Sequence, residues 1–295
     1  MNYFIHLLIG AALFLPACKS SPVQTAIPVL EDDRINETSG IAASSAHTGI
    51  YYVHNDSGDT SRFFAIDSEG KLKGVYYFDG DHSLPAPGVK DCEDIAVSTG
   101  PEAGAAYVYI GDIGDNSAVR KYITIYRIKE PALPSSAAAP VNTAASALYL
   151  KYPDGPRDAE TLMADPVEKL LYIVSKREDT VRIYTAPLNF NANDTVVLTK
   201  RASLFVEGSG EGKWIVAGDI SQNGQQVLLK SYTKVYYWKR SSSAEPIWQT
   251  LQRTPSILPY TLEPQGEAIG FTIDGTGYYT VSEGVHAKLY YYKLP

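Results

Sequence analysis

The chain has 295 residues, of which 44% are hydrophobic and 20% are charged, and this composition excludes an intrinsically disordered protein. The net charge of −7 argues against a nucleic-acid partner, because phosphate binding requires a positive surface. The 22 tyrosines favour β-strands over helices, since aromatic side chains suit the half-buried surface of a sheet.

The N-terminus has the pattern of an export signal. Residues 1–17, MNYFIHLLIGAALFLPA, contain an apolar run that is short for a bilayer span and ends at small residues before Cys18. We predict a signal peptide over 1–17, a tether over 18–24 and one domain over 25–295. The letters LPAC resemble the bacterial lipobox, which implies that Cys18 is lipidated and becomes the mature N-terminus. The protein is then expected to be exported and anchored to a bacterial membrane, in the periplasm or at the cell surface. Plain secretion is the alternative.

Short strand-like runs alternate with turns rich in Gly, Asp, Asn and Ser along the rest of the chain, without a long helical periodicity. Five segments share one pattern, in which an aliphatic anchor is usually followed by a small or slender residue. They are ETSGIAAS (37–44), DCEDIAVS (91–98), DAETLMAD (158–165), VAGDISQN (216–223) and QGEAIGFT (265–272), with Ile41, Ile95, Leu162, Ile220 and Ile269 as anchors. Two or three further strand-like runs follow most segments. Units of three or four strands that repeat in this way predict a β-propeller.

The anchors predict five blades. The stretch before Ile41 and the stretch after Ile269 together make one more interval of similar length. The mature chain is therefore accounted for if TAIPVL (25–30) supplies the outer strand of the last blade, beside KLYYYKL (288–294). Six blades are the alternative, with the long interval after Ile95 as the place for the extra one. We accordingly predict an all-β fold with few helices.

Several motifs together resemble a family of uncharacterised secreted bacterial propeller lipoproteins. They are HNDSGD, DCEDIA, YIGDIGDN, DAETLM, LKSYT, PQGEAIGF and TVSEG. The resemblance covers nearly all of the mature chain and implies a single extracytoplasmic propeller. More remotely, the expected architecture is similar to calcium-binding propellers of the regucalcin, gluconolactonase and paraoxonase kind and to esterase-like phytases. This second resemblance implies an architecture and not an activity, because fold does not fix function.

Acidic residues gather where the first strand of each blade is expected to begin and the second to end, which we call the upper face. The residues two before the anchors are Ser39, Glu93, Glu160, Gly218 and Glu267. The hairpins after the second strands carry Asp56 and Asp59, Asp112 and Asp115, Lys176, Tyr232, and Glu283. Converging carboxylates repel one another, so they must bind a cation, pair with basic groups or take up protons.

We predict a divalent-cation site on this face, with Ca²⁺ as the ion, because Ca²⁺ takes about six to eight oxygen ligands. The predicted ligands are Glu93, Glu160, Glu267, Asp56 and Asp112. The residues predicted to contact a bound molecule are Asp115, Lys176, Tyr232, Glu283 and Arg120. The alternative is purely structural: Asp, Gly and Asn are common in turns for backbone reasons, and Lys176 would then only pair with Glu160.

Two functions remain open. The first is a membrane-anchored binding module whose upper face receives a small molecule or a protein. The second is a metal-dependent hydrolase of the esterase, lactonase or phosphoesterase type, in which the cation polarises the scissile oxygen and activates water. The first is favoured, because no complete set of nucleophile, base and orienting group can be named in the sequence.

Lipidation of Cys18 leads to a simple test. Cys18→Ser is expected to move the protein from the membrane fraction to the soluble fraction and to leave its melting temperature unchanged, because acyl chains anchor through buried methylenes worth about 0.8 kcal/mol each. Fractionation followed by mass spectrometry of the N-terminus measures both changes. Membrane association that persists in the variant would show that another surface holds the protein there.

Overall fold

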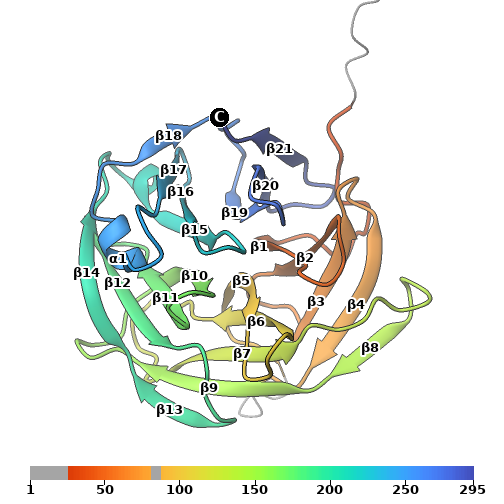
Figure 1. Cartoon of the computed structure of the whole chain (residues 1–295). Helices are drawn as coiled ribbons and strands as arrows, with labels where there is room; N and C mark the ends of the chain where they lie inside the picture. The colour runs from red at the N-terminus through yellow and green to blue at the C-terminus, as the bar shows by residue number, and fades with distance from the viewer. Residues whose placement is uncertain (1–25, 81–87) are drawn as a thin grey trace, which may run out of the picture.

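A computed structural model describes residues 26–80 and 88–295, and nearly all of their regular structure is β-strand. The strands form five sheets arranged as blades around a central channel (Figure 1). The predicted five-bladed propeller is therefore confirmed. The signal peptide, Cys18 and most of the tether lie outside the described residues.

Each blade begins at the channel and steps outward through antiparallel strands. Blade 1 contains β1 (Thr38–Ala43), β2 (Ile50–Asn55), β3 (Arg62–Asp67) and β4 (Leu72–Phe78). Blade 2 contains β5 (Cys92–Thr99), β6 (Ala106–Asp112), β7 (Ile123–Lys129) and β9 (Ala145–Lys151). Blade 3 contains β10 (Ala159–Asp165), β11 (Leu170–Ser175), β12 (Thr180–Pro187) and β14 (Thr199–Phe205). Blade 4 contains β15 (Ile215–Ile220), β16 (Gln226–Ser231), β17 (Val235–Lys239) and β18 (Ser256–Leu258), and blade 5 contains β19 (Gly266–Phe271), β20 (Gly277–Ser282) and β21 (Leu289–Lys293).

The core is divided into five hydrophobic clusters, one in each seam between neighbouring blades. Successive residues of a strand point to opposite faces of its blade, so they enter different seams. Tyr51 packs against Tyr279 of blade 5, with ring centroids 4.7 Å apart, whereas Tyr52 belongs to the seam with blade 2. Both faces of an inner strand are covered, and its residues are apolar or small on both sides for that reason.

The N-terminal segment closes the ring. Val29 pairs with Lys288 in an antiparallel bridge, the Leu30 amide donates to the Ala287 carbonyl at 3.0 Å, and the Leu289 amide donates to the Pro28 carbonyl at 2.8 Å. The predicted pairing thus occurs at the beginning of β21 and does not extend along the whole strand. The Leu30 side chain is fully buried in the seam between blades 1 and 5.

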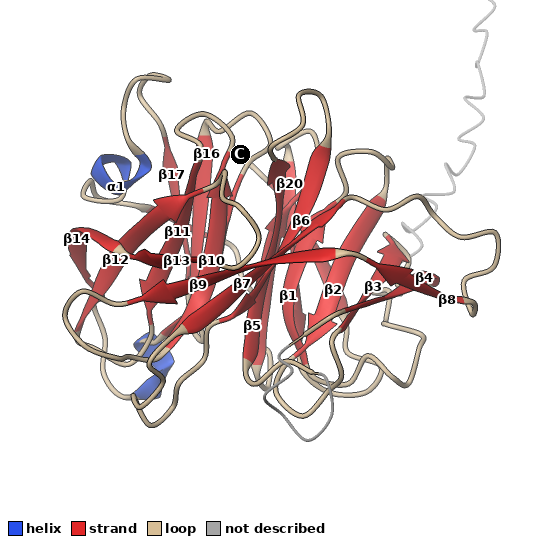
Figure 2. Cartoon of the chain, turned by 90° about the horizontal axis from the view of Figure 1, so that it is seen from below, coloured by secondary structure: helices blue, strands red, loops and turns tan. Residues whose placement is uncertain are grey.

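Two short strands cross from one blade to the preceding one. β8 (Pro140–Thr143) lies in the chain between β7 and β9 but pairs in parallel with β4 of blade 1, and Figure 2 shows the two strands together at the rim. β13 (Asp194–Val197) lies between β12 and β14 but pairs in parallel with β9 of blade 2. The extra length after Ile95 therefore contains a connection between blades, and it does not contain a sixth blade.

Helix is confined to single turns. The described residues contain a four-residue α-helix, α1 (Ile247–Thr250), and a three-residue 3₁₀-helix (Glu211–Lys213). In the described part of the chain, no helix has the length and the apolar character required to cross a membrane. The low helix content agrees with the prediction from the sequence.

The closing segment can be tested by truncating its buried side chain. Leu30→Ala is expected to cost about 2–5 kcal/mol through lost burial and a residual cavity, and so to lower the melting temperature by roughly ten degrees. Ile27→Ala is the matched control, because the Ile27 side chain is 45% exposed and should change the melting temperature little. Equal melting temperatures for the two variants would show that residues 26–31 are only a tether.

Candidate functional site

The upper face is built by a β-bulge in the innermost strand of every blade. The pairing of the first and second strands shifts register at one residue in each blade. The residues at the shift are Ser39, Glu93, Glu160, Val216 and Glu267. A bulge inserts one unpaired residue and changes the direction of its side chain. In a regular strand that is packed on both faces, the same side chain would have to point into a seam between blades. Three blades therefore present a glutamate from the same backbone position.

In blade 4, the repeat aligns two residues earlier than the sequence pattern predicts. Its bulge lies between Ile215 and Ala217, so Val216 is the equivalent of Glu93, and Gly218 is the equivalent of the anchor Ile95. The repeat pattern in the sequence predicts Gly218 at the beginning of the strand and Ile220 as the anchor. A shift of two residues keeps the alternation of faces, and the pattern therefore looked intact. Blade 4 presents no carboxylate at its bulge.

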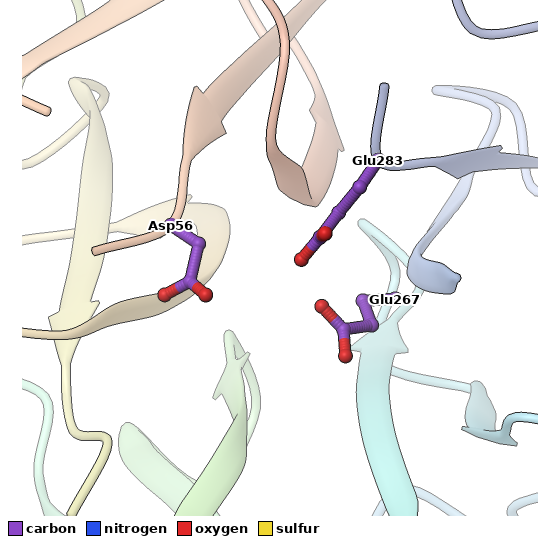
Figure 3. Close-up of side chains that lie close together, drawn as sticks. All are labelled: Asp56, Glu267 and Glu283. Atoms are coloured by element: carbon purple, nitrogen blue, oxygen red, sulfur yellow. The ribbon is translucent and has the colours of Figure 1, made fainter. Parts of the chain in front are cut away.

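Five carboxylates lie close together on this face. Ligand oxygens of Asp56, Glu267 and Glu283 all lie within 4.8 Å of one another, and so do those of Asp56, Asp91 and Glu93. Figure 3 shows the first three side chains pointing toward one another from the ends of three different strands. Asp56 belongs to both groups, so it joins the acids of blade 5 to those of blade 2. We call these five residues the acidic cluster.

Burial and mutual repulsion hold protons on the cluster. Burial, reinforced by Asp91 and Glu267, raises the pKa of Asp56 to about 7. Burial, reinforced by Glu267, raises the pKa of Glu283 to about 9, and burial with nearby acids raises the pKa of Asp91 to about 6. The pKa of Glu93 is also well above its usual range, chiefly through burial and then through Glu160. Without a cation, the cluster cannot be fully ionised near neutral pH.

A lysine and a tyrosine flank the cluster on the side of blades 3 and 4. The Lys176 ammonium bonds to Glu160, lies 4.0 Å from the Glu267 carboxylate and donates to the Tyr232 hydroxyl at 3.3 Å. The Tyr232 hydroxyl in turn donates to Glu267. Burial lowers the pKa of Lys176, but Glu160 and Glu267 more than compensate, so its pKa lies above the usual value. The pairing of Lys176 with Glu160 was the structural alternative in the sequence analysis.

Unsatisfied acceptors remain around this lysine. Glu160 Oε2 is buried and has no hydrogen-bond partner within residues 26–80 and 88–295. The Glu93 side chain is 2% exposed, and none of the described residues donates a hydrogen bond to its carboxylate. A buried acceptor such as Glu160 Oε2 is costly unless a proton, a water or a cation satisfies it.

Asp112 and Arg120 do not join the cluster. Asp112 is fully buried, accepts the backbone amides of Lys90 and Asp91 at 3.1 Å each, and pairs with Arg120 at 2.7 Å. Asp112 pairs with Cys92 at the end of β6. Its equivalent in blade 1 is Asn55, which comes one residue before Asp56. A shift of one residue reverses the direction of a side chain.

Asp115 has a local structural role in the turn that follows. Its carboxylate accepts the amides of Val119 and Arg120 at 2.9 and 2.8 Å, and its own amide donates to Asp158. The sequence GDIGDN is therefore first of all a turn. Gly114 nevertheless bears on the cluster, because a Cβ atom at this position would collide with the carboxylates of Glu93 and Asp91.

Asp91 is the member of the cluster that the sequence analysis did not select. It precedes β5, where the chain is still a loop, and its partners come from blades 1 and 2. A signal for the correct register was present in the sequence. Strand two of each blade ends in a short polar residue, namely Asn55, Asp112, Ser175, Ser231 and Ser282. Alignment on these residues places Asp112 with Asn55 and not with Asp56.

Comparisons with known proteins identify no family for this chain. No family model matches the sequence, and no curated protein matches it either. Among solved structures, the chain is similar to hydrazine synthase of Kuenenia stuttgartiensis, with 10% sequence identity, a TM-score of 0.45, and coverage of 87% of this chain and 83% of the other. A likeness at this level carries no functional argument. The comparisons show no link to the lipoprotein family or to regucalcin-like propellers.

The raised pKa of Asp56 predicts an unusual pH dependence for the metal-free protein. An unfolded aspartate ionises near pH 4 and folded Asp56 near pH 7, so the folded state binds more protons between these values and gains stability as the pH falls. We expect the melting temperature in chelator to rise by a few degrees from about pH 8 to pH 6.5.

Lys230, whose pKa burial lowers to about 8, titrates at the upper limit of this pH window and opposes the rise there. The lower limit avoids His54, whose pKa burial lowers to about 4. Asp56→Asn should reduce the rise and not abolish it, because Glu283, with a pKa of about 9, and Asp219, with a pKa of about 7, contribute to the same slope. The same slope in the variant and the wild type would assign the effect to another group.

Proposed function

We propose that the acidic cluster binds one divalent cation, Ca²⁺, and that the propeller is a cation-dependent binding module on the surface or in the periplasm of a bacterium. The observation that carries this proposal is that Asp56 belongs to two groups of three carboxylates, one with Glu267 and Glu283 and one with Asp91 and Glu93, whose oxygens lie within 4.8 Å of one another in each group. Carboxylate oxygens are the ligands that Ca²⁺ prefers, and two charges on the ion would offset the repulsion within the cluster.

The position of the cluster supports a binding role. The bulges of blades 2 and 5 direct Glu93 and Glu267 to one end of the channel, and Gln222 crosses the other end. Its side-chain amide donates to the Val97 carbonyl at 3.2 Å and its carbonyl accepts from Ser45 at 3.0 Å. A ligand that completes the coordination of the cation would therefore approach from the upper face.

Anchoring belongs to the same proposal. The LPAC sequence before the domain supports lipidation of Cys18, which would hold the propeller at a membrane while its upper face samples the surroundings. The partner would be a small molecule or a protein that donates an oxygen ligand to the cation.

Thermal unfolding with and without calcium tests the cation site. Binding to the folded state alone stabilises it by about 2.7 kcal/mol at a hundredfold excess over Kd, so millimolar Ca²⁺ should raise the melting temperature of the wild type by several degrees. Asp56→Asn should abolish most of this response, because Asp56 is common to both ligand groups. Calorimetric titration of the metal-free protein measures the stoichiometry, which we expect to be one.

Two further variants sharpen the calcium test. Glu69→Gln removes the same charge from the opposite end of blade 1, in the turn between β3 and β4, and should respond to calcium as the wild type does. Gly114→Ala should displace Glu93 and Asp91 and weaken calcium binding, with little change in metal-free stability, because the ends of these side chains can move. A wild type that responds to neither Ca²⁺, Mg²⁺ nor Mn²⁺ would refute the cation site.

One observation keeps a metal-dependent hydrolase as a second candidate. A carboxylate with a pKa of about 7, as at Asp56, suits a general base at neutral pH, and Lys176 lies on the other side of Glu267. A panel of esters and phosphoesters, assayed with calcium, distinguishes the two functions. Turnover that is lost in Asp56→Asn would support the hydrolase, whereas calcium binding without turnover would support the binding module.

A further inference from the structure

A groove at the rim of the propeller is separate from the acidic cluster. It lies between blades 3 and 4 and has a volume of about 600 Å³, within the usual range for small-molecule sites. One wall is the end of β14 and the other is formed by β17 and β18, and α1 packs beside β14 (Figure 1). None of its lining residues belongs to the acidic cluster.

The groove is apolar and open. Tyr236 and Trp238 form part of its lining, with ring centroids 6.2 Å apart, and the Trp238 indole nitrogen already donates to the Arg253 carbonyl at 2.7 Å. On its rims, the Phe205 side chain is 68% exposed and that of Ile257 is 57% exposed. Large apolar side chains on both sides of a concave surface are unusual for a surface that stays in contact with water.

One cation in the lining is not neutralised. The Lys234 ammonium forms neither an ion pair nor a hydrogen bond with any residue of the described ranges, although its backbone amide donates to Ser231. The Arg253 guanidinium, by contrast, is bonded to Glu245 and to the Lys239 carbonyl. Glu207 is the one carboxylate among the lining residues, and it does not pair with Lys234.

We propose that this groove is a second binding site, for an amphipathic organic anion with a flat, mainly apolar body. The exposed side chains of Phe205 and Ile257 would pack against the body of the ligand above the largely buried Tyr236 and Trp238, and the Lys234 ammonium would contact its carboxylate or sulfonate. Apolar walls with one free cation favour this class over a neutral hydrocarbon, which would leave the lysine unused. They also favour it over a sugar, which requires many polar partners.

Titration with anilinonaphthalene sulfonate, a fluorescent amphipathic anion, tests the site in the folded protein. We expect saturable binding of one probe per chain. Lys234→Met keeps the aliphatic stem and should weaken binding roughly tenfold through loss of a charge-assisted contact. Ile257→Asp should abolish binding, because it adds a negative charge to the rim. The melting temperature of each variant shows whether its fold is intact.

Matched controls separate the groove from nonspecific adsorption. Lys239→Met removes a lysine that does not line the groove, and Val197→Asp charges a side chain on β13 that is 58% exposed; both should bind the probe as the wild type does. Asp56→Asn should also bind normally, so failure of the cation proposal leaves this one intact. Equal binding by all variants would refute the site. Absence of probe binding together with a dimer that Ile257→Asp dissociates in sedimentation would show that a second copy of the chain occupies the groove.

Discussion

The upper face depends on one backbone irregularity, repeated in all five innermost strands. These strands are covered on both sides by the seams between blades, and a regular strand would direct every side chain into a seam. The bulge adds a residue outside this alternation and leaves its side chain at the mouth of the channel. Glu93, Glu160 and Glu267 stay out of the apolar seams because they occupy the bulge position. The same position takes serine in blade 1 and valine in blade 4, so the ring of acids is interrupted there.

Electrostatic repulsion on the upper face opposes folding, and only part of it is relieved by the protein itself. Lys176 neutralises Glu160 and lies 4.0 Å from Glu267, and Tyr232 donates to Glu267, but Asp56, Asp91, Glu93 and Glu283 form no ion pair with a basic residue of the described ranges. By contrast, Asp94 is fully buried and Asp219 is partly buried, and both accept backbone amides of the next blade, at Leu162 and Phe271. Those two acids join inner strands. Among the described residues, the carboxylates of the cluster make no such bond between inner strands.

Much of the architecture could be predicted from the sequence, because seams between blades impose a repeated apolar anchor. Four of the predicted anchors occupy equivalent positions in the pairing of the first and second strands: Ile41, Ile95, Leu162 and Ile269. In blade 4 this position is occupied by Gly218, and the predicted anchor Ile220 lies two residues later. The site was harder to predict. A hairpin acid points to the cluster or away from it according to a single residue of register, and Asp91 reaches the cluster from a loop. The parallel pairing of β8 and β13 depends on contacts between blades that no local pattern contains.

The crossing strands β8 and β13 also limit how this chain can change over evolutionary time. Propellers are often regarded as arrays whose units can be duplicated or lost. Here the polypeptide of blade 2 completes the sheet of blade 1, and that of blade 3 completes the sheet of blade 2. Recombination that excised the second unit would take the fifth strand from the first and leave β13 without its neighbour. Loss of one of the first three units would therefore also remove a strand pairing from its neighbour.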